Sequence, residues 1–116
     1  MESQSAIAAL AALAQPSRLA LYRLLVQAGQ EGLSPGVIGE RLDIPAPTLS
    51  FHLKALSHAG LIDDRRESRN IFYSANYPHM NALVGFLTEN CCGGRACAPV
   101  ARMPKLAIAA RRRKAS

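Results

Sequence analysis

Two short amphipathic segments with a brief connection between them constrain this 116-residue chain most strongly. The first opens with Ser34 and Pro35, a typical helix cap and first turn, and ends near Leu42. Pro47 begins the second, and Gly60 follows its end. In this second segment, apolar residues recur four and three positions apart, on one face of a helix: Leu49, Leu53 and Leu56. Together the segments predict a helix-turn-helix.

Further helices and a hairpin are predicted around this pair. Periodic apolar residues predict helices over 5–14 and 16–29, and a last helix from Pro78 to Gly93-Gly94. Residues 61–73 change from apolar to polar and back, which predicts two short strands joined at 67–69. Inward-facing residues of the second helix are expected to be Leu19, Tyr22, Leu25 and Val26. This order predicts a mainly α fold with a small β-hairpin, a winged helix-turn-helix.

Charge is distributed unevenly along the chain. Residues 1–90 hold seven basic and eight acidic residues, whereas residues 91–116 hold seven basic residues and no acidic one. We therefore expect a folded DNA-binding and dimerisation domain over 1–92 and a cysteine-containing, basic, flexible tail over 93–116. Such a tail either touches phosphates without sequence preference or only keeps the protein soluble.

Several functional classes are disfavoured by composition. The apolar stretch 6–14 is too short to cross a bilayer and lacks the basic flank of a signal peptide, so we expect a soluble cytoplasmic protein without a membrane partner. An odd number of cysteines, three, argues against a disulfide framework. The three histidines are scattered along the sequence, so an enzyme is not expected.

The second helix of the helix-turn-helix is the candidate for reading DNA. With successive residues about 100° apart, the face opposite the leucines is centred on Phe51, flanked by Thr48, Ser50 and Lys54. Phe51 either contacts a thymine methyl group or packs on the wing of its own domain. His52 falls at the margin of the buried face, where a hydrogen-bonded structural histidine is favoured over direct base contact.

The hairpin carries three arginines within five residues, partly offset by three acidic residues. Arg65, Arg66 and Arg69 are expected to reach phosphates or an adjacent minor groove of double-stranded operator DNA. The alternative is a solvated hairpin of mixed charge. Next to a helix-turn-helix, the DNA-contacting interpretation is favoured.

The first and last helices are expected to form the interface of a homodimer. This interface would hold two recognition helices about 34 Å apart, one turn of DNA. The interface residues predicted from the two apolar stripes are Ile7, Leu10, Leu13, Met80, Leu83, Val84 and Leu87. Cys91 is expected to continue the stripe of the last helix, four positions beyond Leu87.

Three thiols, Cys91, Cys92 and Cys97, lie within seven residues. Neighbouring Cα atoms are about 3.8 Å apart, which is too close for Cys91 and Cys92 to bridge each other readily. A structural zinc site needs four ligands, whereas three sulfurs suit a soft three-coordinate ion such as As(III) or Sb(III). A disulfide switch that joins Cys97 to Cys91 or Cys92 is the alternative.

Several motifs resemble the ArsR/SmtB family of metalloregulatory repressors over roughly residues 5–90. They are Leu13-Ala14-Gln15-Pro16-Ser17-Arg18-Leu19, Leu49-Ser50-Phe51-His52-Leu53-Lys54-Ala55-Leu56, Ala59-Gly60-Leu61-Ile62 and Glu89-Asn90-Cys91-Cys92. The resemblance implies a homodimeric repressor of arsenic resistance that leaves DNA when As(III), or alternatively Sb(III) or a methylated As(III), binds; no organic cofactor is implied.

This chain departs from the family pattern at several positions. The cysteine motif that other members carry in the helix-turn-helix is absent, as is the Asp/His site on the last helix. Pro47 replaces a usual polar residue, and Ser68 stands where the wing often has Gly. Two further functions stay open: a redox-responsive repressor on the same fold, and a nonspecific DNA-binding protein that uses the basic tail.

Overall fold

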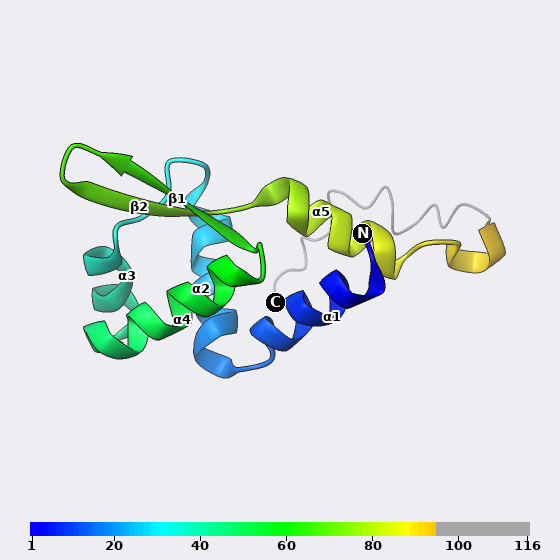
Figure 1. Cartoon of the computed structure of the whole chain (residues 1–116), viewed down its shortest axis with the longest axis horizontal. Coiled ribbons are helices and arrows are strands. Elements are labelled where there is room, and N and C mark those ends of the chain that lie inside the picture. Colours follow the sequence, from blue (N-terminus) through cyan, green and yellow to red (C-terminus); the bar gives the residue numbers. More distant parts are fainter. Residues whose placement is uncertain (95–116) are drawn as a thin grey trace, which may run out of the picture.

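Five helices, one hairpin and a short terminal turn build the domain in the computed structural model, which describes residues 1–94 (Figure 1). Most of the predicted tail, including Cys97, lies outside the described residues. The elements are α1 (Ser3–Leu13), α2 (Pro16–Ala28), α3 (Pro35–Leu42), α4 (Ala46–His58), β1 (Ile62–Glu67), β2 (Asn70–Ala75), α5 (Tyr77–Leu87) and the 3₁₀ turn η1 (Cys91–Gly94). The predicted winged helix-turn-helix is confirmed.

Side-chain caps fix where three helices begin. The Gln15 Oε1 atom accepts a hydrogen bond from the Arg18 backbone N–H at 2.8 Å, at the start of α2. The Ser34 Oγ atom accepts one from the Val37 backbone N–H at 3.3 Å, which confirms the predicted start of α3. Asn76 caps α5 in the same way. Each cap satisfies a backbone donor that the helix leaves unpaired.

The turn between α3 and α4 is tight because of Gly39. Asp43 adopts the left-handed conformation, φ 56°, and the Ile44 N–H donates to the Gly39 carbonyl oxygen at 3.0 Å. A Cβ atom at Gly39 would lie 3.1 Å from the Ile44 carbonyl oxygen and 3.4 Å from a Leu49 methyl group. The glycine therefore allows α3 to approach the turn and α4 closely.

A leucine core joins α4 to the helices behind it. Leu49, Leu53 and Leu56 are buried, as their spacing predicts, and they pack in one cluster with Ile38 of α3. In α2 the prediction was partly wrong: Tyr22 and Leu25 are buried, but Leu21 is buried in place of Leu19, which is 46% exposed. The buried face of α2 passes through residues 21, 22 and 25, and Leu19 lies about 110° away from it. Val26 is partly buried.

The hairpin packs over the helix-turn-helix through β2. Its strands are antiparallel, with Ile62 opposite Ala75 and Glu67 opposite Asn70, and Ser68 takes the left-handed conformation in the turn, φ 58°. Leu33, before α3, makes two backbone hydrogen bonds with Tyr73, of 2.8 and 2.9 Å. The wing is thereby fastened to the start of α3.

Small residues bring α1 close to its neighbours. Ala6, Ala9 and Ala12 are buried, whereas Ile7 is 64% and Leu10 42% exposed. α1 contacts α2, α4 and α5 (Figure 1). Ile7 and Leu10 of α1 therefore point away from the core of the single chain, whereas Leu13 packs against it.

The last helix ends earlier than predicted. α5 stops at Leu87, and the Thr88 Oγ1 atom donates a hydrogen bond to the Val84 carbonyl oxygen at 2.8 Å. Asn90 and Cys92 then adopt left-handed conformations, φ 58° and 57°, that no α-helix contains. The prediction of a helix reaching Gly93-Gly94 was wrong, and so was the prediction that Cys91 continues its stripe. Within residues 1–94, every helix is too short or too polar to span a membrane.

Candidate nucleic-acid interface

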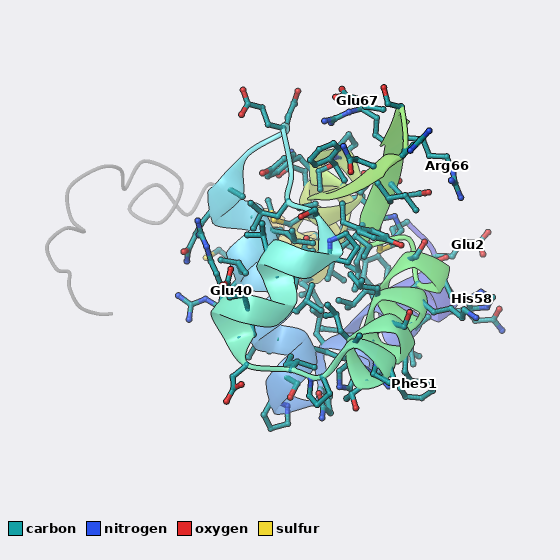
Figure 2. All side chains as sticks on the ribbon, turned by 90° about the vertical axis from the view of Figure 1, so that its left-hand side faces the viewer. Glu2, Glu40, Phe51, His58, Arg66 and Glu67 are labelled. Atoms are coloured by element: carbon teal, nitrogen blue, oxygen red, sulfur yellow. The ribbon has the colours of Figure 1, made fainter. Side chains whose placement is uncertain are left out.

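Helix α4 has one buried and one exposed face, as a recognition helix requires. Thr48, Ser50, Phe51 and Lys54 are all exposed, and the three leucines opposite them hold the helix against the core. Figure 2 shows Phe51 and His58 on the outer side of α4. The exposed face offers hydroxyl groups, an ammonium group and an aromatic ring, which can contact base edges and phosphates.

His52 is buried, with 6% of its surface exposed, and is hydrogen-bonded to α2. Its Nδ1 atom accepts a hydrogen bond from the Arg18 Nε–H at 3.2 Å, so Nδ1 carries no proton. Burial, and secondarily the charge of Arg18, lowers the pKa of His52 below its usual 6.5. Burial and this hydrogen bond fit the structural role that the sequence favours for His52, in which it links the recognition helix to α2.

Phe51 does not pack on the wing. Its ring is 62% exposed and lies under the guanidinium group of Arg18, whose central carbon is 5.5 Å from the ring centroid. Arg18 therefore contacts two adjacent residues of the recognition helix, through a hydrogen bond to His52 and a cation–π contact to Phe51. Sequence reasoning missed this role of Arg18, because 34 positions separate it from His52.

The three wing arginines play different parts. Arg65 pairs with Glu67 at 2.9 Å, donates to the Glu31 carbonyl oxygen at 3.2 Å and lies 5.1 Å from the Phe72 ring centroid. Arg66 and Arg69 are exposed and have no carboxylate partner within residues 1–94. Figure 2 shows Arg66 and Glu67 near the hairpin tip. Arg65 thus stabilises the wing, whereas Arg66 and Arg69 present their charge to solvent.

A polar hollow of about 310 Å³ separates the recognition helix from the wing. Ser50, Lys54, Ser57 and His58 line it on the α4 side, and Asp64 and Tyr73 line it on the wing side. Sequence reasoning missed Ser57 and His58, because they lie in the last turn of α4, past the predicted contact residues. Their hydroxyl and imidazole groups can bond phosphate oxygens of a strand that passes between helix and wing.

The predicted dimer residues divide into exposed and buried sets. Leu83 is buried in its own chain, and Leu13 and Met80 are partly buried. The other four are exposed by 42–64% on the adjacent helices α1 and α5: Ile7, Leu10, Val84 and Leu87. These four residues form an apolar patch, which we call the α1/α5 patch.

Cys91 and Cys92 are both exposed, in η1 beyond the end of α5. Their sulfur atoms are 3.6 Å apart, whereas an S–S bond is about 2.05 Å long, so Cys91 and Cys92 are not bonded to each other. Cys92 is nevertheless disulfide-bonded. Within residues 1–94 no three His, Cys, Asp or Glu side chains gather in a way that could hold a metal ion. Cys97 lies outside the described residues, so the three-thiol site stays a prediction.

Comparison with known proteins identifies the family. Residues 13–65 match a helix-turn-helix domain family. Over 77 residues the chain is 44% identical to the uncharacterized HTH-type transcriptional regulator YceK of Bacillus subtilis, covering 66% of this chain and 76% of that protein.

Two solved structures are also similar. The structure of an ArsR-like transcriptional regulator from Rhodococcus sp. RHA1 matches with a TM-score of 0.66 and 25% identity over 72% of this chain and 76% of that one. The homodimeric winged helix-turn-helix DNA-binding domain of Mb0332 from Mycobacterium bovis, a possible ArsR-family regulator, matches with a TM-score of 0.61 and 25% identity over 80% and 86%.

These relatives are regulators of transcription, in line with a DNA-binding rather than an enzymatic role. The exposed face of α4 and the wing that carries Arg66 and Arg69 occupy the positions expected of such a regulator. This chain belongs to the ArsR family of winged helix-turn-helix transcriptional regulators.

Proposed function

We propose that this protein is a homodimeric repressor that binds operator DNA and releases it when As(III) binds Cys91, Cys92 and Cys97. The observation that carries the DNA-binding part is the exposed face of α4, which Arg18 and three buried leucines hold in place beside two unpaired wing arginines. A helix fixed in this way can enter a major groove while the wing contacts the backbone.

Dimerisation is supported by the α1/α5 patch. Four large apolar side chains on two adjacent helices are 42–64% exposed in the single chain, and covering them in an interface would remove this surface from water and favour assembly. The similar domain from Mycobacterium bovis is homodimeric. Two-fold symmetry would place two recognition helices about 34 Å apart, matching successive turns of a palindromic operator.

The thiol site is supported by the chemistry of its sulfur atoms. Cys91 and Cys92 are exposed with their Sγ atoms 3.6 Å apart, a spacing that suits two ligands of one large soft ion. Arsenite, As(OH)₃, exchanges its three hydroxyl groups for three thiolates: each S–H loses its proton, each As–O bond breaks, and three water molecules leave. Antimonite exchanges three hydroxyl groups in the same way, whereas a monomethylated As(III) keeps its methyl group, exchanges two hydroxyl groups for two thiolates and releases two water molecules.

Coupling to DNA follows from the position of these thiols. Cys91 lies four residues beyond Leu87 of the α1/α5 patch, so gathering three sulfurs around one ion pulls on the end of α5. A coupling free energy of about 1–3 kcal/mol would weaken operator binding roughly 5- to 150-fold. DNA must weaken arsenite binding by the same factor.

The test is operator binding, measured by fluorescence anisotropy with DNA selected for tight binding to this protein. Arsenite added to the reduced protein should release the DNA, and the Cys91→Ser, Cys92→Ser and Cys97→Ser variants should retain it. Thr88→Ser, a substitution next to the site that leaves all three thiols, should respond like the parent. Release from Cys92→Ser at the parent's arsenite concentration would overturn the three-thiol scheme.

A redox-responsive repressor is the second candidate, favoured by one observation: Cys92 is disulfide-bonded in the structure. Oxidation of two thiols to a disulfide transfers two protons and two electrons to a peroxide: hydrogen peroxide becomes two water molecules, and an alkyl hydroperoxide becomes an alcohol and one water molecule. In this case peroxide should release the operator without arsenite, and dithiothreitol should restore binding. Indifference to peroxide would eliminate this candidate.

A further inference from the structure

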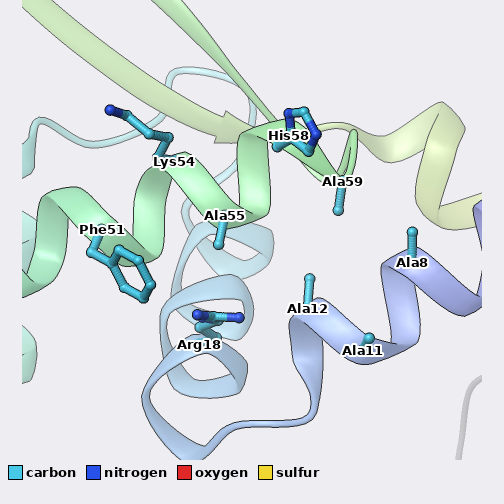
Figure 3. A pocket seen from close by; sticks show the side chains of 9 residues that line it. All are labelled: Ala8, Ala11, Ala12, Arg18, Phe51, Lys54, Ala55, His58 and Ala59. Carbon is cyan, nitrogen blue, oxygen red and sulfur yellow. The ribbon is translucent and has the colours of Figure 1, made fainter.

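A hollow of about 480 Å³ lies between α1, the start of α2 and the recognition helix (Figure 3). Alanines form its apolar floor: Ala8, Ala11 and Ala12 come from α1, and Ala55 and Ala59 come from the end of α4. Because each of these side chains ends at Cβ, the helices leave space between them. The volume falls within the range of small-molecule sites, about 300–1,000 Å³.

The rim of this hollow is basic. Arg18, Lys54 and His58 line it, and none of its lining residues is acidic. The one ion pair within residues 1–94 joins Arg65 and Glu67 on the wing, so no carboxylate of that part of the chain neutralises this rim. An apolar floor with an unneutralised basic rim is complementary to an apolar molecule that carries a negative charge.

Arg18 is already held in place for such a ligand. Its Nε–H donates to His52, and its guanidinium carbon lies 5.5 Å from the centroid of the exposed Phe51 ring. The two terminal amino groups stay available as a planar pair of donors, the geometry that matches a carboxylate. Figure 3 shows Arg18 and Phe51 on the same side of the hollow, facing the alanines.

We propose that this hollow binds a small aromatic carboxylate. The ring would lie on the alanines beside Phe51, and the carboxylate would accept hydrogen bonds from Arg18 and Lys54. An inorganic anion or a DNA phosphate fits less well, because the alanine floor offers it no hydrogen bond and the apolar surface would stay uncovered. The charge and the apolar body of the ligand are both required.

Occupancy of this hollow would oppose DNA binding. Phe51 and Lys54 belong to the exposed face of α4, so a carboxylate held there covers part of the surface that meets the operator. The ligand would therefore be a second input to the repressor, independent of the thiols beyond α5. It acts on the recognition helix directly, whereas an ion at the cysteines acts through the dimer.

The first experiment compares two probes of nearly equal shape, naphthalene-2-carboxylate and the neutral 2-naphthalenemethanol, by calorimetric titration of the full-length reduced protein without DNA. The carboxylate should bind at least about tenfold more tightly, and it should shift the amide resonances of Ala11 and Ala59 in NMR spectra. Equal affinities, or no shift at these amides, would overturn the proposal.

The second experiment fills the hollow. Ala11→Phe should weaken naphthalene-2-carboxylate binding at least about tenfold, whereas Ala20→Phe, at an exposed alanine of α2 that does not line the hollow, should leave it unchanged. Lys54→Gln should weaken binding about three- to tenfold and tests the charge without altering the floor. Undiminished binding to a folded Ala11→Phe variant, verified by its melting temperature, would refute the site.

A third experiment, operator binding in the presence of the carboxylate, distinguishes this proposal from the arsenite response. Naphthalene-2-carboxylate should lower operator affinity equally in the parent protein and in Cys92→Ser. A carboxylate that binds in the hollow but leaves operator affinity unchanged would refute the competition, and a response lost in Cys92→Ser would assign the effect to the thiols. Failure of arsenite to release DNA bears on the thiol scheme alone.

Discussion

The two halves of this domain differ in how completely they bury their apolar residues. In the helix-turn-helix, the large side chains point inward: Ile38 and Leu56 are fully buried, and Leu49 and Leu53 are 3% exposed. In α1 and α5, four large apolar side chains are exposed by 42–64%, whereas Leu83 is buried and four others pack against the core, namely Leu13, Tyr77, Met80 and Phe86. The same chain thus forms a well-buried core at the helix-turn-helix and leaves an apolar surface at the α1/α5 patch.

This difference shows which half a single chain can complete. Burying an apolar side chain removes its surface from water and stabilises the fold, whereas a cluster of exposed ones is typical of an interface. The recognition helix is therefore positioned by its own chain. In the proposed dimer a second chain would cover the α1/α5 patch, and regulation would act on the distance between two recognition helices rather than on the helices themselves.

The largest effect is expected from truncating a buried side chain in the core of the helix-turn-helix. Leu56→Ala removes a fully buried side chain between α4 and its neighbours and should lower the free energy of unfolding by roughly 2–5 kcal/mol, measured by urea denaturation. Leu19→Ala, at a leucine that is 46% exposed, should cost less than about 1 kcal/mol. Equal losses would mean that burial in the core is not what makes the Leu56 side chain stabilising.

A smaller effect on folding and a large effect on assembly are expected at the patch. Val84→Glu places a charge on a side chain that is 54% exposed, so the monomer should stay folded, but burying that charge in a dimer is costly. Sedimentation velocity should show a monomer, and operator affinity should fall at least about 100-fold, because each half-site then binds alone.

The matched control is Gln27→Glu, which adds the same charge at an exposed position of α2. It should remain a dimer with nearly the parent's operator affinity. A dimeric Val84→Glu protein would place the interface elsewhere, and a monomer that binds operator normally would remove the need for spacing between two recognition helices.

Local patterns in the sequence were enough to predict the helix-turn-helix. The start of α3 depends on Ser34 and Pro35, which act within one helical turn, and the buried face of α4 follows from the spacing of Leu49 and Leu56. The hairpin was also predicted, with its strands joined at 67–69, but β2 runs past the predicted end at Tyr73 to Ala75, which pairs with Ile62.

Features that depend on distant contacts were not predictable in this way. The bond from Arg18 to His52 spans 34 positions, and the buried face of α2 is set by the elements that pack on it, which favour Leu21 over Leu19. The end of α5 depends on the conformation of Asn90, which apolar periodicity does not reveal. The hollow under Phe51 likewise arises only when α1 and α4 are brought together.

The smallest effect concerns the single polar link buried among the described core residues. His52 is neutral in the folded protein, since its Nδ1 atom accepts from Arg18, and burial lowers its pKa below 6.5. As the pH falls below about 6.5, the unfolded chain binds a proton at this histidine before the folded chain does, so stability decreases with decreasing pH. Above that pH both states are neutral there and the effect vanishes.

His52→Gln removes this titration while its amide oxygen can still accept from Arg18. At pH 7.5 the variant should differ from the parent by less than about 1.5 kcal/mol, the value of one hydrogen bond. Between pH 7.5 and 5.5 the melting temperature of the parent should fall further than that of the variant. An equal fall in melting temperature for the parent and the variant would show that protonation of His52 does not weaken the attachment of α4 to α2.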